Sequence, residues 1–182
     1  NLLGHSYLGG LGHEFNHGLV VDPAGDVYVF GASPKTWGSP VNPMAPEGFR
    51  DWTIAKVNGS GVLQWNTFHG GTADDIAWAA ALDAAGGLYV VGECQTGWGS
   101  PLNAYSGGPE ATIVKLEAAT GALQWHAFFG QAGSDYAYGV ACDGDDLVVV
   151  SGMSDAAWGL PVEPFHGGPG DGLVLALSSD GA

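Results

Sequence analysis

The sequence has few positively charged residues. Four Lys and Arg stand against 19 Asp and Glu, which gives a formal net charge of −15 at pH 7. Nucleic acids and anionic membrane surfaces attract basic proteins, so we expect neither to be a partner. The charge is compatible with a bound cation such as Ca²⁺, although acidity is also an ordinary means of staying in solution.

Cysteine and long apolar runs are scarce as well. Cys94 and Cys142 are the only cysteines, too few for a disulfide framework, so we expect two buried free thiols rather than a bridge. No apolar run reaches the roughly 18 residues of a membrane-spanning helix, and no secretory leader is recognisable. Because the chain begins with Asn1 and not with Met, we expect it to be a processed or excised piece.

Glycine, in contrast, is abundant. It supplies 32 of 182 residues, while charged residues make up only 13% and hydrophobic residues 46%. This hydrophobic content argues against a disordered chain, and many glycines suit tight turns between short strands. We therefore predict an all-β protein.

A repeated sequence pattern is the strongest feature of the chain. Segments of the form Trp-Gly-x-Pro begin at Trp37, Trp98 and Trp158, at spacings of 61 and 60 residues. β-branched and alternating segments predict four strands in the second unit, at 76–82, 88–91, 112–116 and 123–128. Such a unit predicts a β-propeller of three four-stranded blades, and a β-solenoid is the alternative. We treat the chain as a single propeller (or part of one) over 1–182, with repeats at approximately 1–61, 62–121 and 122–182.

The two ends of the chain suggest how a ring would close. Residue 1 aligns with residue 62, the start of a fourth strand, and residue 182 aligns with residue 122, where another fourth strand would begin. We therefore expect an N-terminal strand, around 5–8, to complete the last blade and to remove an exposed edge. Closed propellers have about four to eight blades. Two copies forming a six-bladed ring, a piece of a longer protein and a steep three-bladed ring are the forms to be distinguished.

Several segments of the second unit form a recognisable series. They are Gly70-Gly71-Thr72-Ala73-Asp74-Asp75, Gly87-Leu88-Tyr89-Val90-Val91-Gly92 and Ala111-Thr112-Ile113-Val114-Lys115-Leu116. In this order they resemble the bacterial β-propeller repeat family called SBBP, over nearly the whole chain. The resemblance implies a propeller in a secreted or cell-envelope bacterial protein, and it implies no activity. The chain departs from the family pattern in its Trp-Gly-x-Pro loops, so the resemblance extends to the fold and not to a shared ligand.

A second similarity concerns two tryptophans. The segment 116–125, which ends in Trp125, is similar to the tryptophan-docking motif of quinoprotein propellers, and 57–65 is a partial copy that ends in Trp65. The similarity implies that both tryptophans pack between blades. Since packing alone explains the motif, we do not expect a quinone cofactor from it.

Acidic residues recur at fixed places in the units. Glu14, Asp75 and Asp135 each come directly before the first strand of a unit, and a second aligned set is Asp51, Glu110 and Asp171. Carboxylates gathered on one face could bind Ca²⁺ through their oxygens. The interpretation that we prefer is structural, with each carboxylate accepting backbone N–H bonds from a turn.

Aromatic residues supply the other candidate binding positions. Trp37, Trp98 and Trp158 lie in long loops, where a Trp could stack on a sugar ring or fold over the end of its blade as a lid. A second aligned set, each member three residues after the entry acid, is expected to line a central channel: His17, Trp78 and Tyr138.

These observations favour a non-catalytic extracellular module for protein interaction, assembly or surface scaffolding. An enzyme needs a polar cluster that breaks the repeat, and most acids of this chain follow it. The alternatives are a propeller that binds a glycan or small ligand through its loop tryptophans, and an enzyme on a propeller scaffold. The expected partners are a protein or glycan at the cell surface and a second copy of the chain.

Overall fold

The computed structural model describes residues 4–45, 49–131, 133–144 and 146–181. Across these residues the chain forms eleven antiparallel strands and no helix, so the prediction of an all-β protein is confirmed. It follows that these residues contain no helix able to cross a membrane. The strands are β1 Phe15–Val21, β2 Val27–Ser33, β3 Asp51–Val57, β4 Leu63–His69, β5 Asp75–Leu82, β6 Gly87–Cys94, β7 Glu110–Glu117, β8 Leu123–Phe129, β9 Asp135–Cys142, β10 Leu147–Ser154 and β11 Asp171–Ser178.

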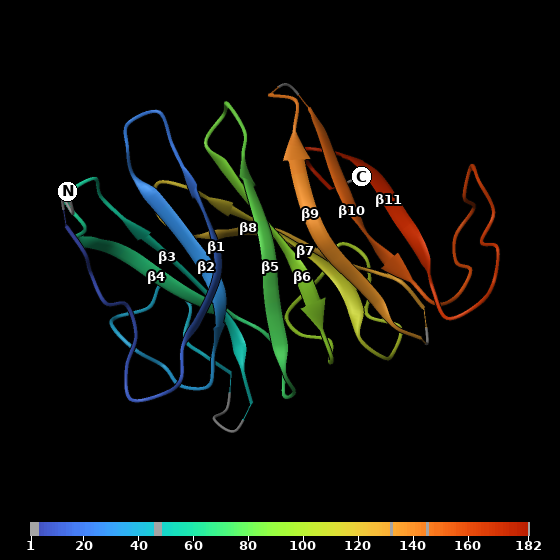
Figure 1. Cartoon of the computed structure of the whole chain (residues 1–182), viewed down its shortest axis with the longest axis horizontal. Coiled ribbons are helices and arrows are strands. Elements are labelled where there is room, and N and C mark those ends of the chain that lie inside the picture. Colours follow the sequence, from blue (N-terminus) through green and yellow to red (C-terminus); the bar gives the residue numbers. More distant parts are fainter. Residues whose placement is uncertain (1–3, 46–48, 132, 145, 182) are drawn as a thin grey trace.

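The strands belong to three separate sheets that lie in a row (Figure 1). The first sheet has the order β1-β2-β3-β4, the second β5-β6-β7-β8, and the third β9-β10-β11. Each is a meander in which consecutive strands pair, as expected when short turns connect antiparallel strands. The four strands predicted for the second unit are thus found as β5 to β8.

Aspartates set the turn between the first two strands of the first and second sheets. The Asp22 carboxylate accepts hydrogen bonds from the backbone N–H groups of Ala24 and Asp26, both at 2.9 Å. Asp83 does the same for Ala85 at 2.9 Å and Gly87 at 2.6 Å. An Asp that bonds the backbone two residues ahead favours a tight turn, which fixes the register of the hairpin that follows.

Two hydrophobic layers join the three sheets, because alternate side chains of the middle sheet point to opposite neighbours. The layer between the first and second sheets is built from Tyr28, Phe30, Trp52, Ile54 and Trp65 against Ala77, Leu88, Val90, Cys94, Val114, Leu116, Ala118 and Phe128. The layer between the second and third contains Tyr89, Val91, Ala111 and Ile113 against Ala137, Val148, Val150 and Leu177. Cys94 and Cys142 carry free thiols; that of Cys94 is fully buried and that of Cys142 only partly buried, so the expectation of two buried thiols is correct for Cys94 alone.

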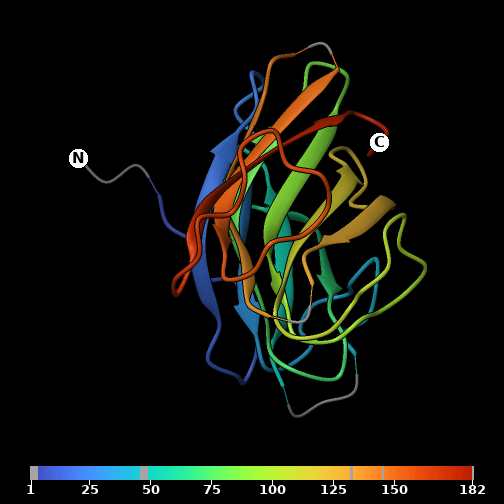
Figure 2. The same cartoon turned by 90° about the vertical axis from the view of Figure 1, so that its right-hand side faces the viewer.

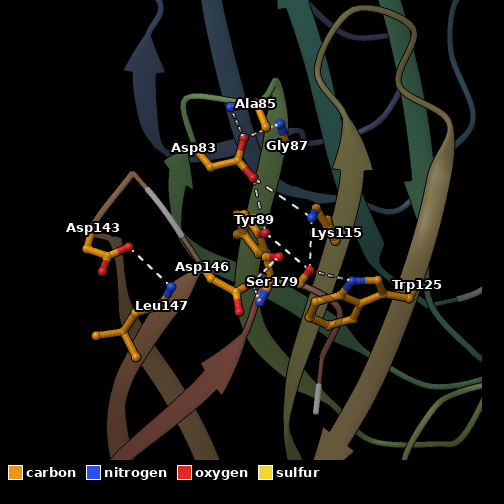
Figure 3. Close-up of polar contacts among 10 residues, drawn as sticks. All are labelled: Asp83, Ala85, Gly87, Tyr89, Lys115, Trp125, Asp143, Asp146, Leu147 and Ser179. Atoms are coloured by element: carbon orange, nitrogen blue, oxygen red, sulfur yellow. Dashed lines mark hydrogen bonds and ion pairs between the residues drawn. The ribbon is translucent and has the colours of Figure 1, made fainter.

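Polar side chains also tie neighbouring sheets together. The carbonyl oxygen of Ser179, just beyond β11, accepts hydrogen bonds from the Lys115 ammonium at 2.9 Å, the Trp125 indole N–H at 3.1 Å and the Tyr89 hydroxyl at 3.3 Å (Figure 3). Trp65 of the first sheet likewise donates to the carbonyl of Ala118, 3.2 Å away in the second. These contacts agree with the packing role predicted for Trp65 and Trp125.

The expected closure of the ring is wrong for a single chain. The third sheet has three strands, and residues 5–8, which were expected to complete it, belong to no strand and lie beside the first sheet. The first and third sheets occupy opposite ends of the row, so the N-terminal segment and β11 are separated by the whole stack (Figure 1). Figure 2 looks along the row, with the third sheet facing the viewer. The chain therefore does not form a closed propeller of three blades.

Candidate functional site

A β-bulge interrupts the first strand of every sheet at the same place. The register shifts between Asn16 and Gly18 in β1, between Ala77 and Ala79 in β5, and opposite Ser151 and Gly152 in the third sheet. The extra residues are His17, Trp78 and Tyr138, the set expected to line a channel. Bulges redirect side chains and are frequent beside binding sites, so we treat these three residues as the candidate site and call them the aromatic row.

Glycine on the second strand makes each bulge feasible. A Cβ atom at Gly31 would lie 1.7 Å from the carbonyl oxygen of Phe15, and one at Gly92 would lie 2.0 Å from that of Ile76. At Gly152 the corresponding distance, to the oxygen of Tyr136, is 1.8 Å. Only glycine permits so close an approach of two backbones. The aligned glycines were therefore a signal for the bulges that the sequence analysis did not use.

The aromatic row is continuous across the three sheets. The His17 and Trp78 rings are stacked, with centroids 4.6 Å apart and planes 16° apart. Trp78 and Tyr138 meet edge to face at 6.3 Å, and Tyr138 stacks on Tyr136 at 5.9 Å. A bond of 2.9 Å between His17 Nδ1 and the carbonyl oxygen of Ala77 fixes the first ring. The result is a row of rings on which planar or sugar-like groups could stack.

Glu93 of β6 is a site residue that the sequence analysis missed. Its side chain is largely buried, and burial raises its pKa, an effect that the nearby Trp78 indole N–H and the charge of Arg50 oppose. Among the described residues the Trp78 indole nitrogen has no hydrogen-bond partner, so it acts on Glu93 as a nearby dipole. Ala32 and Met153 occupy the corresponding positions of the other sheets. This break in the repeat was the signal that could have identified Glu93.

Comparison with known proteins adds no relative. A scan against protein-family models gives no match, and a search of curated proteins finds no similar sequence.

The loop tryptophans point toward their own sheets. Trp37 is buried and packs edge to face on Phe68. Trp98 stacks on His126 with ring centroids 3.7 Å apart. The His69 ring lies 5.5 Å from Trp98, with the two ring planes tilted by 31°. Burial, with a smaller effect of His126, lowers the pKa of His69 to about 3, so the His69 imidazole is uncharged at neutral pH. The arrangement is the one expected for lids over the sheet ends.

Trp158 follows the same pattern with a polar anchor. Its indole N–H lies 3.1 Å from both Asp135 Oδ1 and Ser154 Oγ, and its ring is partly buried. The three loop tryptophans belong to the loops of three different sheets, and the structure does not bring them together.

The first set of aligned acids holds the glycine-rich loops that precede the inner strands. Asp75 Oδ2 accepts from the Gly71 N–H at 2.7 Å, Asp135 Oδ2 from Gln131 at 3.1 Å, and Glu14 Oε1 from Gly10 at 3.2 Å. Each acid thus acts within its own repeat. In the described ranges no three His, Cys, Asp or Glu side chains converge as a metal site.

The second set of acids bonds the loops before the third strands. Asp51 accepts from the Ala45 N–H at 2.7 Å, Glu110 from Ser106 at 2.6 Å and Gly107 at 2.8 Å, and Asp171 from His166 at 2.6 Å. These bonds match the preferred interpretation, in which the carboxylates receive backbone N–H groups from neighbouring turns.

Asp51 and Asp75 meet on either side of Gly70. A Cβ at Gly70 would lie 2.5 Å from Asp75 Oδ2 and 3.0 Å from Asp51 Oδ1. Burial raises the pKa of Asp75 to about 7, against the opposing hydrogen bonds of Gly71 and Gln95 and with a contribution from the charge of Asp51. Burial likewise raises the pKa of Asp51 to about 6. These two carboxyl groups therefore titrate near neutral pH while serving as structural acceptors.

Proposed function

We propose that this chain is a non-catalytic β-propeller module that assembles with a second copy of itself, at the surface of a bacterial cell or in its envelope. The resemblance of its repeats to the SBBP family supports the propeller and the location. The use of both aligned acid sets as backbone acceptors supports a module without catalytic chemistry, because these acids are spent on holding loops.

The observation that carries the proposal is an uncovered end of the stack. Ile54 of β3 and Ile113 of β7 are fully buried, whereas Val174, at the corresponding place in β11, is 72% exposed. The face of β11 that would cover a next sheet is thus exposed to water. Covering its apolar groups with another protein surface stabilises the complex by about 25 cal/mol per Å² of apolar area buried. A further sheet of the same kind is the most complementary cover, and two copies would supply six.

Light scattering over a dilution series tests this proposal. We expect a particle of twice 18.5 kDa that dissociates only on strong dilution. A mass of 18.5 kDa at every concentration, including the highest attainable, would contradict self-assembly.

The aromatic row supports a second candidate function, the binding of a glycan or another ring-shaped small ligand. Tyr138 is 51% exposed, and the partly buried Trp78 ring meets it edge to face at 6.3 Å. An exposed aromatic ring with a second ring beside it can stack on the apolar face of such a ligand.

Tryptophan fluorescence with short glucose, galactose and N-acetylglucosamine oligosaccharides tests this second function. Trp78→Ala should weaken binding at least tenfold, while Trp158→Phe should retain it because Trp158 faces its own sheet. The opposite pair of results would instead assign binding to the loop tryptophans. No binding by the unchanged protein would rule out these sugars as ligands.

A further inference from the structure

The third sheet has an unpaired edge where the other sheets have a fourth strand. β4 pairs with β3 from Trp52–His69 to Val57–Leu63, and β8 pairs with β7 in the same register. β11 pairs with β10 on one side, and the described chain offers no strand on the other. A free edge of this length is a template for another strand.

The N-terminal segment has the sequence of a fourth strand. Tyr7-Leu8-Gly9-Gly10 corresponds in the repeat to Phe68-His69-Gly70-Gly71, with the aromatic residue and both glycines in place. Phe68 and its counterpart Phe128 are fully buried, whereas Tyr7 is 93% exposed. Tyr7 therefore occupies a position that is buried in the other two repeats, but no neighbouring residues bury it in the single chain.

The segment already lies where the last strand of a preceding sheet would lie. Leu8 packs against the cluster of Trp37, Ala55 and Phe68 on the outer face of the first sheet, in the way that His69 lies against Trp98 of the second. Ser6 Oγ donates to the carbonyl of Gly61 at 2.8 Å, beside the loop that corresponds to the one Trp65 contacts. The segment is thus held in place with its pairing groups uncommitted to any strand.

The third sheet also has the loop that would cover such a strand. In the first two sheets this loop binds the fourth strand through the N–H groups of Val41 and Leu102, which donate to Asn66 and His126 at 2.8 Å. The corresponding residue of the third sheet, Val162, is 100% exposed. The side chains of Asn66 and His126 bond the carbonyls of Trp37 and Trp98, and His5 has the corresponding place in the N-terminal segment.

We propose that residues 5–8 of one copy add to β11 of a second copy as its fourth strand, and that the second copy does the same in return. The first and third sheets lie at opposite ends of the row, so one chain cannot supply both halves of this pairing (Figure 1). The register of β4 on β3 and of β8 on β7 places Tyr7 opposite Leu173, Ser6 opposite Val174 and His5 opposite Leu175. This inference rests on the proposed self-assembly and specifies its contact.

This contact has to depend on backbone pairing, and not on side-chain bonds such as those that Tyr89 and Lys115 donate to the Ser179 carbonyl (Figure 3). The positions of Tyr89 and Lys115 are taken in the third sheet by Val149 and Ala176, which cannot donate to a neighbour's carbonyl. The contact between copies consequently differs from the two contacts within the chain, so it can be weakened separately by changing the N-terminal segment.

Disulfide trapping tests the register directly. Residues directly opposite in an antiparallel pair have Cβ atoms about 4.5–5.5 Å apart, so Ser6→Cys with Val174→Cys should form a covalent dimer under mild oxidation. Leu11→Cys with Val174→Cys is the matched control, since Leu11 is 97% exposed but lies outside the segment. A bridge within one chain, or no bridge in the Ser6 variant, overturns the proposal. So does a dimer that forms equally well in the control.

A charge in the segment provides the second test. Tyr7→Asp should raise the dissociation constant of the dimer at least tenfold without changing the circular dichroism of the chain, while Leu11→Asp should leave it unchanged. If the unchanged protein is dimeric but Tyr7→Asp is equally so, strand exchange is wrong and self-assembly stands. If the unchanged protein is monomeric throughout, both are wrong.

Discussion

Asp75 begins β5 and joins two loops through one carboxylate. It accepts from the Gly71 N–H at 2.7 Å and from the Gln95 N–H at 2.9 Å. Burial nevertheless raises the pKa of Asp75 to about 7, so the protonated form is favoured in the folded state more than in the unfolded chain. The group therefore binds more protons when folded than when unfolded between pH 4 and pH 7, roughly the interval between the two pKa values.

Through Asp75 alone, the free energy of unfolding should consequently fall as the pH rises from about 4 to 7. Asp75→Asn should make this dependence shallower by up to roughly 1 kcal/mol per pH unit, since the group no longer titrates. Asp74→Asn is the control, because the Arg50 hydrogen bond lowers the pKa of Asp74 and moves its titration to more acidic pH. Urea unfolding at several pH values measures the slopes, and equal slopes for the two variants would contradict this account.

Individual residues were predictable where the repeat itself dictates their role. The acceptor role preferred for the aligned acids is the one observed, because every repeat needs its loops held in the same way. Glu93 could not be found by the same reasoning, since it stands at a position that is Ala32 in the first sheet. A residue that departs from the repeat has no counterpart in the other units and so leaves no periodic signal.

The inner strands β1, β5 and β9 owe their shape to glycines on the strands beside them. Gly92→Ala would place a Cβ 2.0 Å from the carbonyl oxygen of Ile76 and should destabilise the protein by about 3 kcal/mol or more, at the upper end for overpacking. Gly172→Ala in β11 meets nothing within 4 Å and should change stability by less than about 0.5 kcal/mol. Thermal unfolding of both variants decides the point, and similar losses would mean that the bulge does not require glycine.

Lys56 of the first sheet and Lys115 of the second occupy equivalent positions, but only the Lys115 ammonium group bonds to the neighbouring sheet. Lys115 bonds the carbonyl of Ser179 in the third sheet, whereas Lys56 pairs at 2.9 Å with Asp26 of its own sheet. We expect Lys115→Met to cost about 1.5–3 kcal/mol, the usual value of a hydrogen bond to a charged group, and Lys56→Met to cost less. Urea unfolding of the two variants tests the order, and a larger loss for Lys56→Met would contradict it.

Strands were the most predictable elements, and their long-range pairing was the least. The alternating segment predicted at 123–128 is β8. The turn predicted at 83–87 from its Asp and glycines is observed between β5 and β6. The N-terminal segment aligns in sequence with β4 but forms no strand, and the expectation that it closes its own chain was wrong. Its sequence specifies what it can pair with, but the distance between the ends of the stack depends on how three sheets pack.

The molecule as a whole has a protected centre and unequal ends. The second sheet is covered on both faces, and β6 is buried throughout, whereas β11 exposes one face and one edge. Amide hydrogen exchange in dilute protein should therefore be slowest in β6 and β7 and fastest in β11, because exchange follows local opening. Raising the protein concentration should slow exchange in β11 selectively. Equal exchange in all three sheets would contradict both expectations.

The unequal ends make the contact between copies a heterologous one, in which the donor and the acceptor surfaces differ. The exchange in both directions closes the assembly at two copies when the rotation from one copy to the next is a half turn, and any other rotation would give a larger ring or an open filament. The angle between neighbouring sheets contributes to that rotation, and the small buried residues Ala77 and Ala137 lie in the two layers between the sheets. Enlarging either residue would wedge the sheets apart and change the stoichiometry of the assembly before it unfolds the chain.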